Sequence, residues 1–193
     1  MLKNILLIIF LLGTVNFLTA CSVSAPKQPK NLCEIFKEKP NWYEDAMEVH
    51  KRRGVPINIV MAFIYQESAY VEDAKPPMRW FLFIPYGRGS SAYGYPQAQD
   101  PVWNEYLSEE GGFFTSRDNF SDALDFVSWY MLKTQKINKI PLTNAYLQYI
   151  NYHDGWGGYK KKLYLKNSKL RNIAKNVEKN SRNYASQLRN CKL

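Results

Sequence analysis

An apolar run that ends in a carboxylate constrains the fold of this chain more than any other feature. Residues 55–68 read VPINIVMAFIYQES and carry no charge before Glu67. A helix that is apolar nearly all round is a buried helix. A carboxylate on such a helix is costly unless it is paired, protonated or functional. The run therefore predicts a central helix with an unusual acid at its end.

Two interpretations of Glu67 follow from its position. Burial raises the pKa of a carboxyl group, and the partial negative charge at the end of a helix acts in the same direction. An acid that keeps its proton near neutral pH is what the cleavage of a glycosidic bond requires. The alternative is a structural glutamate that is bonded to nearby backbone or to a lysine.

The first twenty residues have the pattern of an export signal. An apolar run over residues 5–12 follows a single lysine, and the segment is too short and wrongly flanked for a membrane span. Residues 18–21 read LTAC and resemble a bacterial lipobox, in which Cys21 becomes the lipidated first residue. The alternative is an ordinarily secreted protein. Ser22, which follows the cysteine, resembles the signal that sorts lipoproteins to the outer membrane. We therefore expect residues 1–20 to be a signal peptide and the mature protein to be an outer-membrane lipoprotein that faces the periplasm.

The composition after residue 20 predicts where the folded domain begins, and the two remaining cysteines could link its ends. We expect residues 21–40 to hold the lipidated cysteine and a tether, because prolines and lysines alternate there, and residues 41–193 to form one domain. Export permits a disulfide between Cys33 and Cys191 that joins the start of the mature protein to its end. Two free thiols are the alternative.

Positive charge is concentrated at the C-terminus. The net charge of the chain is +9, and residues 160–193 hold eleven Lys and Arg against one acid, which gives +10 for this segment and −1 for the rest. A basic C-terminal helix could hold an anionic polymer or lipid head groups, although a solvated helix face is the alternative. Nucleic acid is not expected as a partner of an exported lipoprotein.

The coarse structure is helical with one long irregular segment. Residues 74–99 are rich in proline and glycine and predict a loop, with short strands around residues 80–84. Long loops in compact domains are often functional. Helical periodicity predicts helices over residues 42–53, 56–68, 100–107, 121–134, 143–152 and 170–188.

Three short motifs then occur in a suggestive order. Glu67-Ser68 stands at a helix end, Gly94-Tyr95-Pro96-Gln97 lies in the aromatic loop, and Tyr152 precedes Gly155. Over residues 42–159 this order resembles the lytic transglycosylase (SLT) domain, which is related to goose-type lysozyme. That family has a Glu-Ser pair, a Gly-Leu-Met-Gln motif and an Ala-Tyr-Asn motif. The resemblance implies a mainly α, lysozyme-like domain with a long loop or small β element after the catalytic helix.

The match departs from the common pattern in two places. Tyr95-Pro96 replaces Leu-Met, and Asn151-Tyr152-His153 stands where Ala-Tyr-Asn is usual. The chain is closer to a less studied lipoprotein branch, whose motifs correspond to SAYGY at residues 91–95 and YHDG at residues 152–155. The substrate cleft is therefore expected to differ in detail.

The resemblance implies a reaction with a single carboxylate. Glu67 would protonate the leaving oxygen of the bond between N-acetylmuramic acid and N-acetylglucosamine in peptidoglycan glycan strands. It would then accept the proton of the C6 hydroxyl, which gives a 1,6-anhydromuramic end. The alternatives are a muramidase that uses water, with Asp154 or Asp73 as a second carboxylate, and a non-catalytic protein that binds glycan strands.

The remaining roles follow from the same resemblance. No cofactor is expected, and the two histidines, His50 and His153, do not make a zinc site without a free cysteine. Each expected binding residue also has a structural alternative, such as core packing for Tyr152. Stacking on sugar rings is expected of aromatic residues, namely Trp80, Tyr93, Tyr95 and Trp156. Substrate binding is assigned to Ser68, Gly94, Tyr95, Gln97, Tyr152 and His153.

Overall fold

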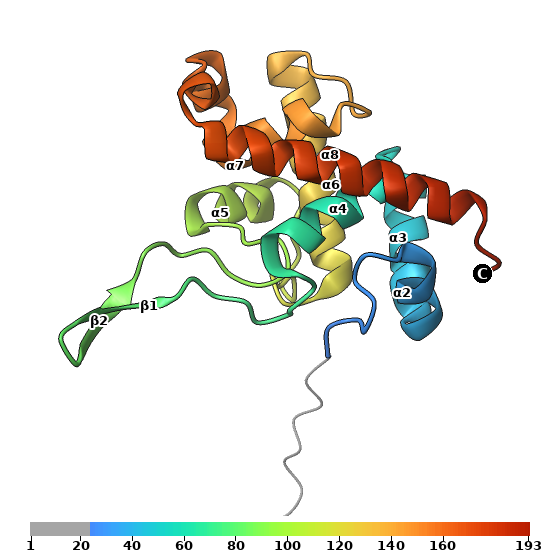
Figure 1. The fold of residues 1–193 in the computed structure, drawn as a ribbon, viewed down its shortest axis with the longest axis horizontal. Coiled ribbons are helices and arrows are strands. Elements are labelled where there is room, and N and C mark those ends of the chain that lie inside the picture. The colour runs from blue at the N-terminus through green and yellow to red at the C-terminus, as the bar shows by residue number, and fades with distance from the viewer. Residues whose placement is uncertain (1–23) are drawn as a thin grey trace, which may run out of the picture.

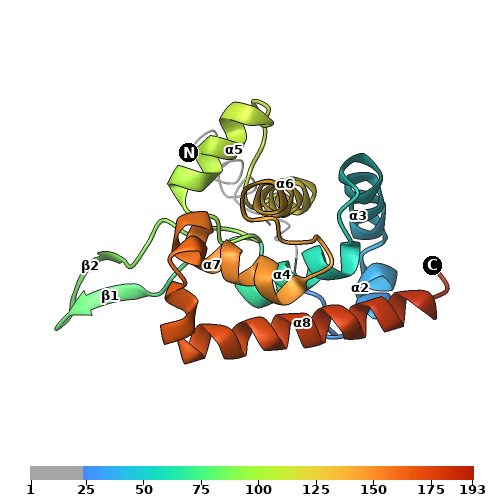
Figure 2. The same cartoon turned by 90° about the horizontal axis from the view of Figure 1, so that it is seen from above.

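A computed structural model describes residues 24–193, so Cys21 and the expected export signal lie outside the described residues. The described part is mainly helical, which confirms the expected fold class (Figures 1 and 2). None of its helices has both the length and the apolar composition needed to cross a bilayer. The helices are α2 (Leu32–Glu38), α3 (Pro40–Arg53), α4 (Ile57–Ser68), α5 (Asp100–Glu109), α6 (Phe120–Asn138), α7 (Ala145–Lys160), a short 3-10 helix (Leu163–Lys166) and α8 (Ser168–Arg189).

Helix α4 is the buried helix that the apolar run predicts. Residues 59–64 are all buried, and the helix packs against both α6 and α8. In Figure 2, α8 runs alongside α4 and α7, and α6 is viewed nearly end-on on the other side of α4. The helix ends at Ala69, which has a left-handed backbone conformation. Glu67 is therefore placed in the last turn of the central helix.

The domain begins before the expected boundary at residue 41. Part of the expected tether, residues 32–38, forms α2, whose apolar side chains are buried in the core. The backbone amide of Leu32 donates to the side chain of Gln187 on α8 at 2.8 Å. The expected disulfide between Cys33 and Cys191 is present, with a Cα–Cα distance of 5.6 Å. Residues 32–40 therefore belong to the domain rather than to a tether.

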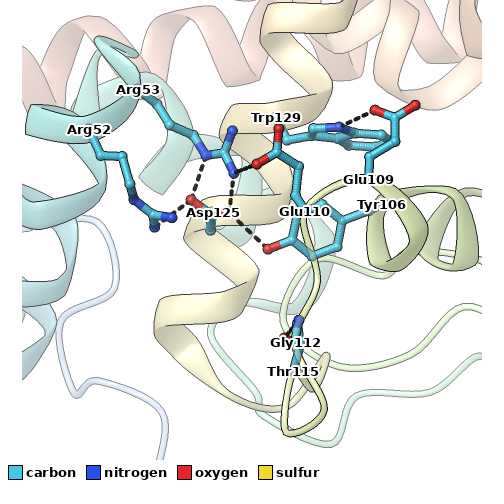
Figure 3. A network of polar contacts seen from close by, with 9 residues as sticks. All are labelled: Arg52, Arg53, Tyr106, Glu109, Glu110, Gly112, Thr115, Asp125 and Trp129. Atoms are coloured by element: carbon cyan, nitrogen blue, oxygen red, sulfur yellow. Dashed lines mark hydrogen bonds and ion pairs between the residues drawn. The ribbon is translucent and has the colours of Figure 1, made fainter.

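A buried ion pair fixes α6 against its neighbours (Figure 3). The carboxylate of Asp125 on α6 bonds to the guanidinium of Arg53 on α3, and only 7% and 9% of these side chains are exposed. Arg52 approaches the same carboxylate at 2.7 Å, and the Tyr106 hydroxyl of α5 donates to it at 2.8 Å. Three helices thus share one buried negative charge, which holds α5 and α6 in place beside the cavity described below.

The long loop contains one β-hairpin. Strands β1 (Met78–Phe81) and β2 (Ile84–Arg88) pair in an antiparallel sheet of two strands. The hairpin extends away from the helices in both views (Figures 1 and 2). Its side chains are almost all exposed. The strands expected around residues 80–84 are present, but they do not pack on the helical core.

Candidate active site

Glu67 lies half-buried at the end of α4 beside Tyr149 of α7. Burial in these apolar surroundings disfavours the charged carboxylate and raises the pKa of Glu67 to about 7. A hydrogen bond from the Tyr149 hydroxyl acts in the opposite direction because it stabilises the carboxylate. The pKa of Tyr149 is raised by its own burial and by the Glu67 charge. Near neutral pH this carboxyl group can therefore both donate and accept a proton.

The raised pKa of Glu67 predicts a pH-dependent stability. Between pH 4.5, where the carboxyl of an unfolded chain titrates, and about pH 7, the folded state holds a proton that the unfolded state has released. Stability contributed by the neutral carboxyl is therefore lost as the pH rises through this window. Urea unfolding measures the free energy of unfolding of Glu67→Gln and of the wild type. The difference is expected to grow in favour of the variant as the pH rises from about 5 to about 8. A difference that is independent of pH would contradict the raised pKa.

Tyr149 was not identified as a functional residue from the sequence. Tyr149 is a buried tyrosine one helical turn before Tyr152, so its spacing places it on the same side of α7. In the sequence, this spacing cannot be told apart from that of a tyrosine that only packs in the core. Because its hydroxyl stabilises the ionised form of Glu67, Tyr149→Phe is expected to raise the pKa of Glu67. The alkaline limb of the pH–activity profile should then move to higher pH. A loss of activity without such a movement would mean that Tyr149 serves packing alone.

A cavity of about 400 Å³ lies between the 94–99 loop, α5, α6 and the middle of α7, where Gly155 interrupts the helical backbone. Glu67 does not line it; Tyr152 does, and its ring also packs against Phe63 on α4, with centroids 5.5 Å apart. Tyr152 therefore stands between the cavity and the helix that carries the acid. The cavity lining is Gln97, Ala98, Gln99, Pro101, Val102, Glu105, Phe126, Tyr130, Tyr152, His153, Asp154, Gly155 and Trp156.

The hydroxyl of Tyr152 is directed to the loop rather than to the acid. It donates to the backbone carbonyl of Pro96 at 2.6 Å, which ties α7 to the 94–97 motif. The ring is surrounded by other aromatic rings, including Tyr130 at a centroid distance of 5.0 Å. Burial raises the pKa of this tyrosine well above its usual value, and the nearby Glu67 charge acts in the same direction. Tyr152 therefore positions the loop and lines the cavity.

Gly94 and Gln97 shape the loop itself. Gly94 has a φ of +72°, and a side chain there would meet the backbone oxygen of Arg117 at 2.1 Å. Position 94 thus requires a glycine because the backbone of Arg117 approaches it closely, and not because a sugar does. The Gln97 amide donates to the carbonyls of Ala74 and Gly94 at 2.8 and 2.9 Å. These bonds hold the loop closed on itself and leave Gln97 on the cavity wall.

Tyr95 and Ser68 are parts of the core in the structure. Only 1% of Tyr95 is exposed, and its ring packs edge-on against Trp42 and Phe120. The Ser68 hydroxyl donates to the carbonyl of Ile64 one turn earlier, at 3.2 Å. In this structure the Tyr95 side chain faces the core, so it does not lie where a sugar could stack on it.

His153 and Asp154, which follow Tyr152 on α7, form a polar pair that lines the cavity. The imidazole Nδ1 lies 3.0 Å from the Asp154 carboxylate, and the histidine is exposed. The second carboxylate oxygen of Asp154 is buried and has no hydrogen-bond partner among residues 24–193. Trp156 stacks on Tyr130 at 4.6 Å. The expected residues Gln97, His153 and Trp156 thus share one cavity.

Comparison with known families decides which class of protein this arrangement represents. A family model described as a transglycosylase SLT domain matches residues 9–191, nearly the whole chain. The chain belongs to the transglycosylase SLT domain family. No match was found among curated proteins or among solved structures. Membership supports transglycosylase-type activity in general and the binding of peptidoglycan.

Among residues 24–193 of this SLT domain, no second carboxylate acts on the pKa of Glu67. The shift in this pKa comes from burial and from Tyr149. Asp73 is exposed, whereas Asp154 lines the cavity beside His153. Within residues 24–193, no group of three or more His, Cys, Asp or Glu side chains is arranged to hold a metal ion.

Proposed function

We propose that this SLT domain is a peptidoglycan lytic transglycosylase that cleaves the β-1,4 bond between N-acetylmuramic acid and N-acetylglucosamine. Glu67 is the general acid and base, and the product carries a 1,6-anhydromuramic end. The observation that carries the proposal is the half-buried Glu67 carboxyl at a helix end, which has a pKa of about 7 and no carboxylate partner among residues 24–193 that acts on it. A retaining glycosidase instead places a second carboxylate about 5 Å from the first.

The proposed reaction needs two proton transfers, and Glu67 takes part in both. Neutral Glu67 donates its proton to the glycosidic oxygen while the bond from that oxygen to the muramic C1 breaks. The carboxylate then takes the proton of the C6 hydroxyl as this oxygen attacks C1, which closes the anhydro ring and restores the acid. The Tyr149 hydroxyl stabilises the carboxylate between the two steps, because its hydrogen bond favours the ionised form.

The cavity is the proposed binding place for a neighbouring part of the glycan strand, and the bond that is cleaved lies outside it, beside Glu67. Gln97, His153 and Trp156 line it and supply polar and aromatic contacts of the kind that sugars require. Ser68, Gly94, Tyr95 and Tyr152 act as positioning residues in this proposal, because each holds the acid-bearing helix or the loop. Gln97 and His153 are the expected side chains that remain at the cavity surface as direct contacts.

A muramidase is the second candidate, and Asp154 is the observation that favours it. This carboxylate lines the cavity and has one buried oxygen without a partner in the described structure, so it could activate water. Mass spectrometry of the fragments released from purified sacculi separates the candidates. Anhydromuropeptides are expected; hydrated reducing ends would indicate the muramidase. Binding to sacculi without any release would indicate a non-catalytic domain.

We also propose that the protein is anchored by lipid at Cys21 and located at the outer membrane, facing the periplasm. The proposal rests on the LTAC sequence at residues 18–21 and on Ser22. Mass measurement of the mature protein is expected to show acyl chains on Cys21 and their loss in Cys21→Ser. An unmodified chain recovered in the soluble fraction would contradict the anchor.

A further inference from the structure

The β1–β2 hairpin presents apolar side chains that the domain itself does not cover. Residues 80–84 read WFLFI, and the exposed fractions of Phe81, Leu82 and Phe83 are 69%, 77% and 83%. An isolated two-stranded hairpin is at best marginally stable in water without a surface against which to pack. Contiguous apolar surface of this kind marks an interaction site. We therefore expect the tip of the hairpin to be buried against a binding partner or surface.

The turn at the tip is built against local preference. Phe81 pairs with Ile84, so Leu82 and Phe83 form a two-residue connection, and Leu82 has a φ of +54°. Glycine, asparagine and aspartate are the residues that such turns favour, because they adopt a positive φ at little cost. A leucine with a positive φ raises the free energy of the folded state, and this side chain is also exposed. Departures from local preference of this kind are expected where a residue serves a function.

Charge is arranged along the hairpin in the order that a membrane surface would require. Arg79 and Arg88 lie at its base, Lys75 precedes it, and residues 74–99 contain no acid. The Arg88 guanidinium is fixed there by a bond to the carbonyl of Pro76. At about 3.3 Å per residue, the turn lies about 10 Å beyond the arginines. Apolar segments at a membrane surface enter the boundary between head groups and acyl chains by about 5–10 Å, so this spacing lets the tip reach that boundary while the arginines stay among the head groups.

We propose that this hairpin inserts its apolar tip, residues 80–84, into the surface of a bilayer that contains anionic lipids. The arginines at the base would contact lipid head groups while the tip enters the acyl region. A sugar ligand fits the tip less well, because carbohydrate sites combine aromatic rings with polar partners, and these five side chains carry no polar group other than the Trp80 indole nitrogen. The inference does not rest on the proposed reaction.

The position of Trp80 provides a direct test. Trp80 is 58% exposed, whereas Trp42, Trp103 and Trp129 are buried and Trp156 is stacked on Tyr130. The full chain is mixed with vesicles of phosphatidylethanolamine and phosphatidylglycerol whose acyl chains carry bromine, which quenches tryptophan only on contact. We expect quenching in the wild type and its loss in Trp80→Phe. Unquenched Trp80 on vesicle-bound protein would overturn the proposal and leave the tip as a surface for another protein.

Two comparisons make the test specific. Leu82→Asn with Phe83→Ser removes the apolar turn without changing either strand or the charge, and it is expected to abolish quenching of Trp80. Vesicles of phosphatidylcholine alone are expected to give weaker quenching, since they lack anionic head groups. Cleavage of purified sacculi, which contain no bilayer, should be unchanged by the tip variant. A tip variant that loses cleavage would assign the hairpin to glycan binding and contradict membrane insertion.

Discussion

Glu67→Gln is expected to reduce the rate of glycan cleavage by about 10³-fold. The variant keeps the size of the side chain and its place beside Tyr149, but it can neither donate nor accept the proton that the reaction needs. A positioned acid or base contributes about 10²–10⁴-fold to the rate of such reactions, and Glu67 serves as both. The measurement is the initial rate at which soluble muropeptides leave purified sacculi.

A matched control separates chemistry from charge and folding. Glu48→Gln makes the same substitution at an exposed position of α3 and is expected to leave the rate unchanged. Both variants should unfold cooperatively, and Glu67→Gln should not lose stability at neutral pH. If Glu67→Gln keeps more than about a tenth of the wild-type rate, the loss is below that of general acid catalysis, and the acid must be another residue.

Asp125→Ala is expected to lower the free energy of unfolding by about 3–5 kcal/mol, because it leaves the Arg53 guanidinium buried without its counter-charge. The Tyr106 hydroxyl loses its acceptor in the same change. For a domain of this size the melting temperature should fall by about 10 °C. Urea unfolding at neutral pH gives the free energy directly.

Two further variants show whether the cost arises from burial of the pair. Glu178→Ala breaks an exposed ion pair with Arg182 on α8 and is expected to cost less than about 1 kcal/mol. Replacing both Arg53 and Asp125 by apolar residues of similar volume should recover most of the stability, since no unpaired charge remains. A cost for Asp125→Ala no greater than that for Glu178→Ala would show that the buried pair does not hold these helices together.

The parts of the fold that the sequence predicted are those with strong local signals. The apolar run requires a buried helix wherever it is placed, so α4 and the position of Glu67 followed from it. Amphipathic spacing predicted α8 for the same reason. The pairing of Cys33 with Cys191 followed from counting cysteines in a chain that is expected to be exported.

The parts that the sequence could not predict depend on contacts between distant segments. The Gly94 conformation is required by the backbone of Arg117, and Tyr95 faces the core because α3 and α6 supply its aromatic neighbours. Tyr149 reaches Glu67 only because the ring of Tyr149 on α7 packs against Phe63 on α4. A motif names the residue types of a site, whereas packing decides which of them face the cavity.

The most direct test of the proposed reaction is digestion of purified sacculi in water labelled with oxygen-18. The transglycosylase account predicts anhydromuropeptides without label, because the C6 hydroxyl of the sugar, and not water, attacks C1. The same fragments should be nearly absent with Glu67→Gln. Reducing ends that carry oxygen-18 would contradict the account and would indicate hydrolysis by a second carboxylate such as Asp154.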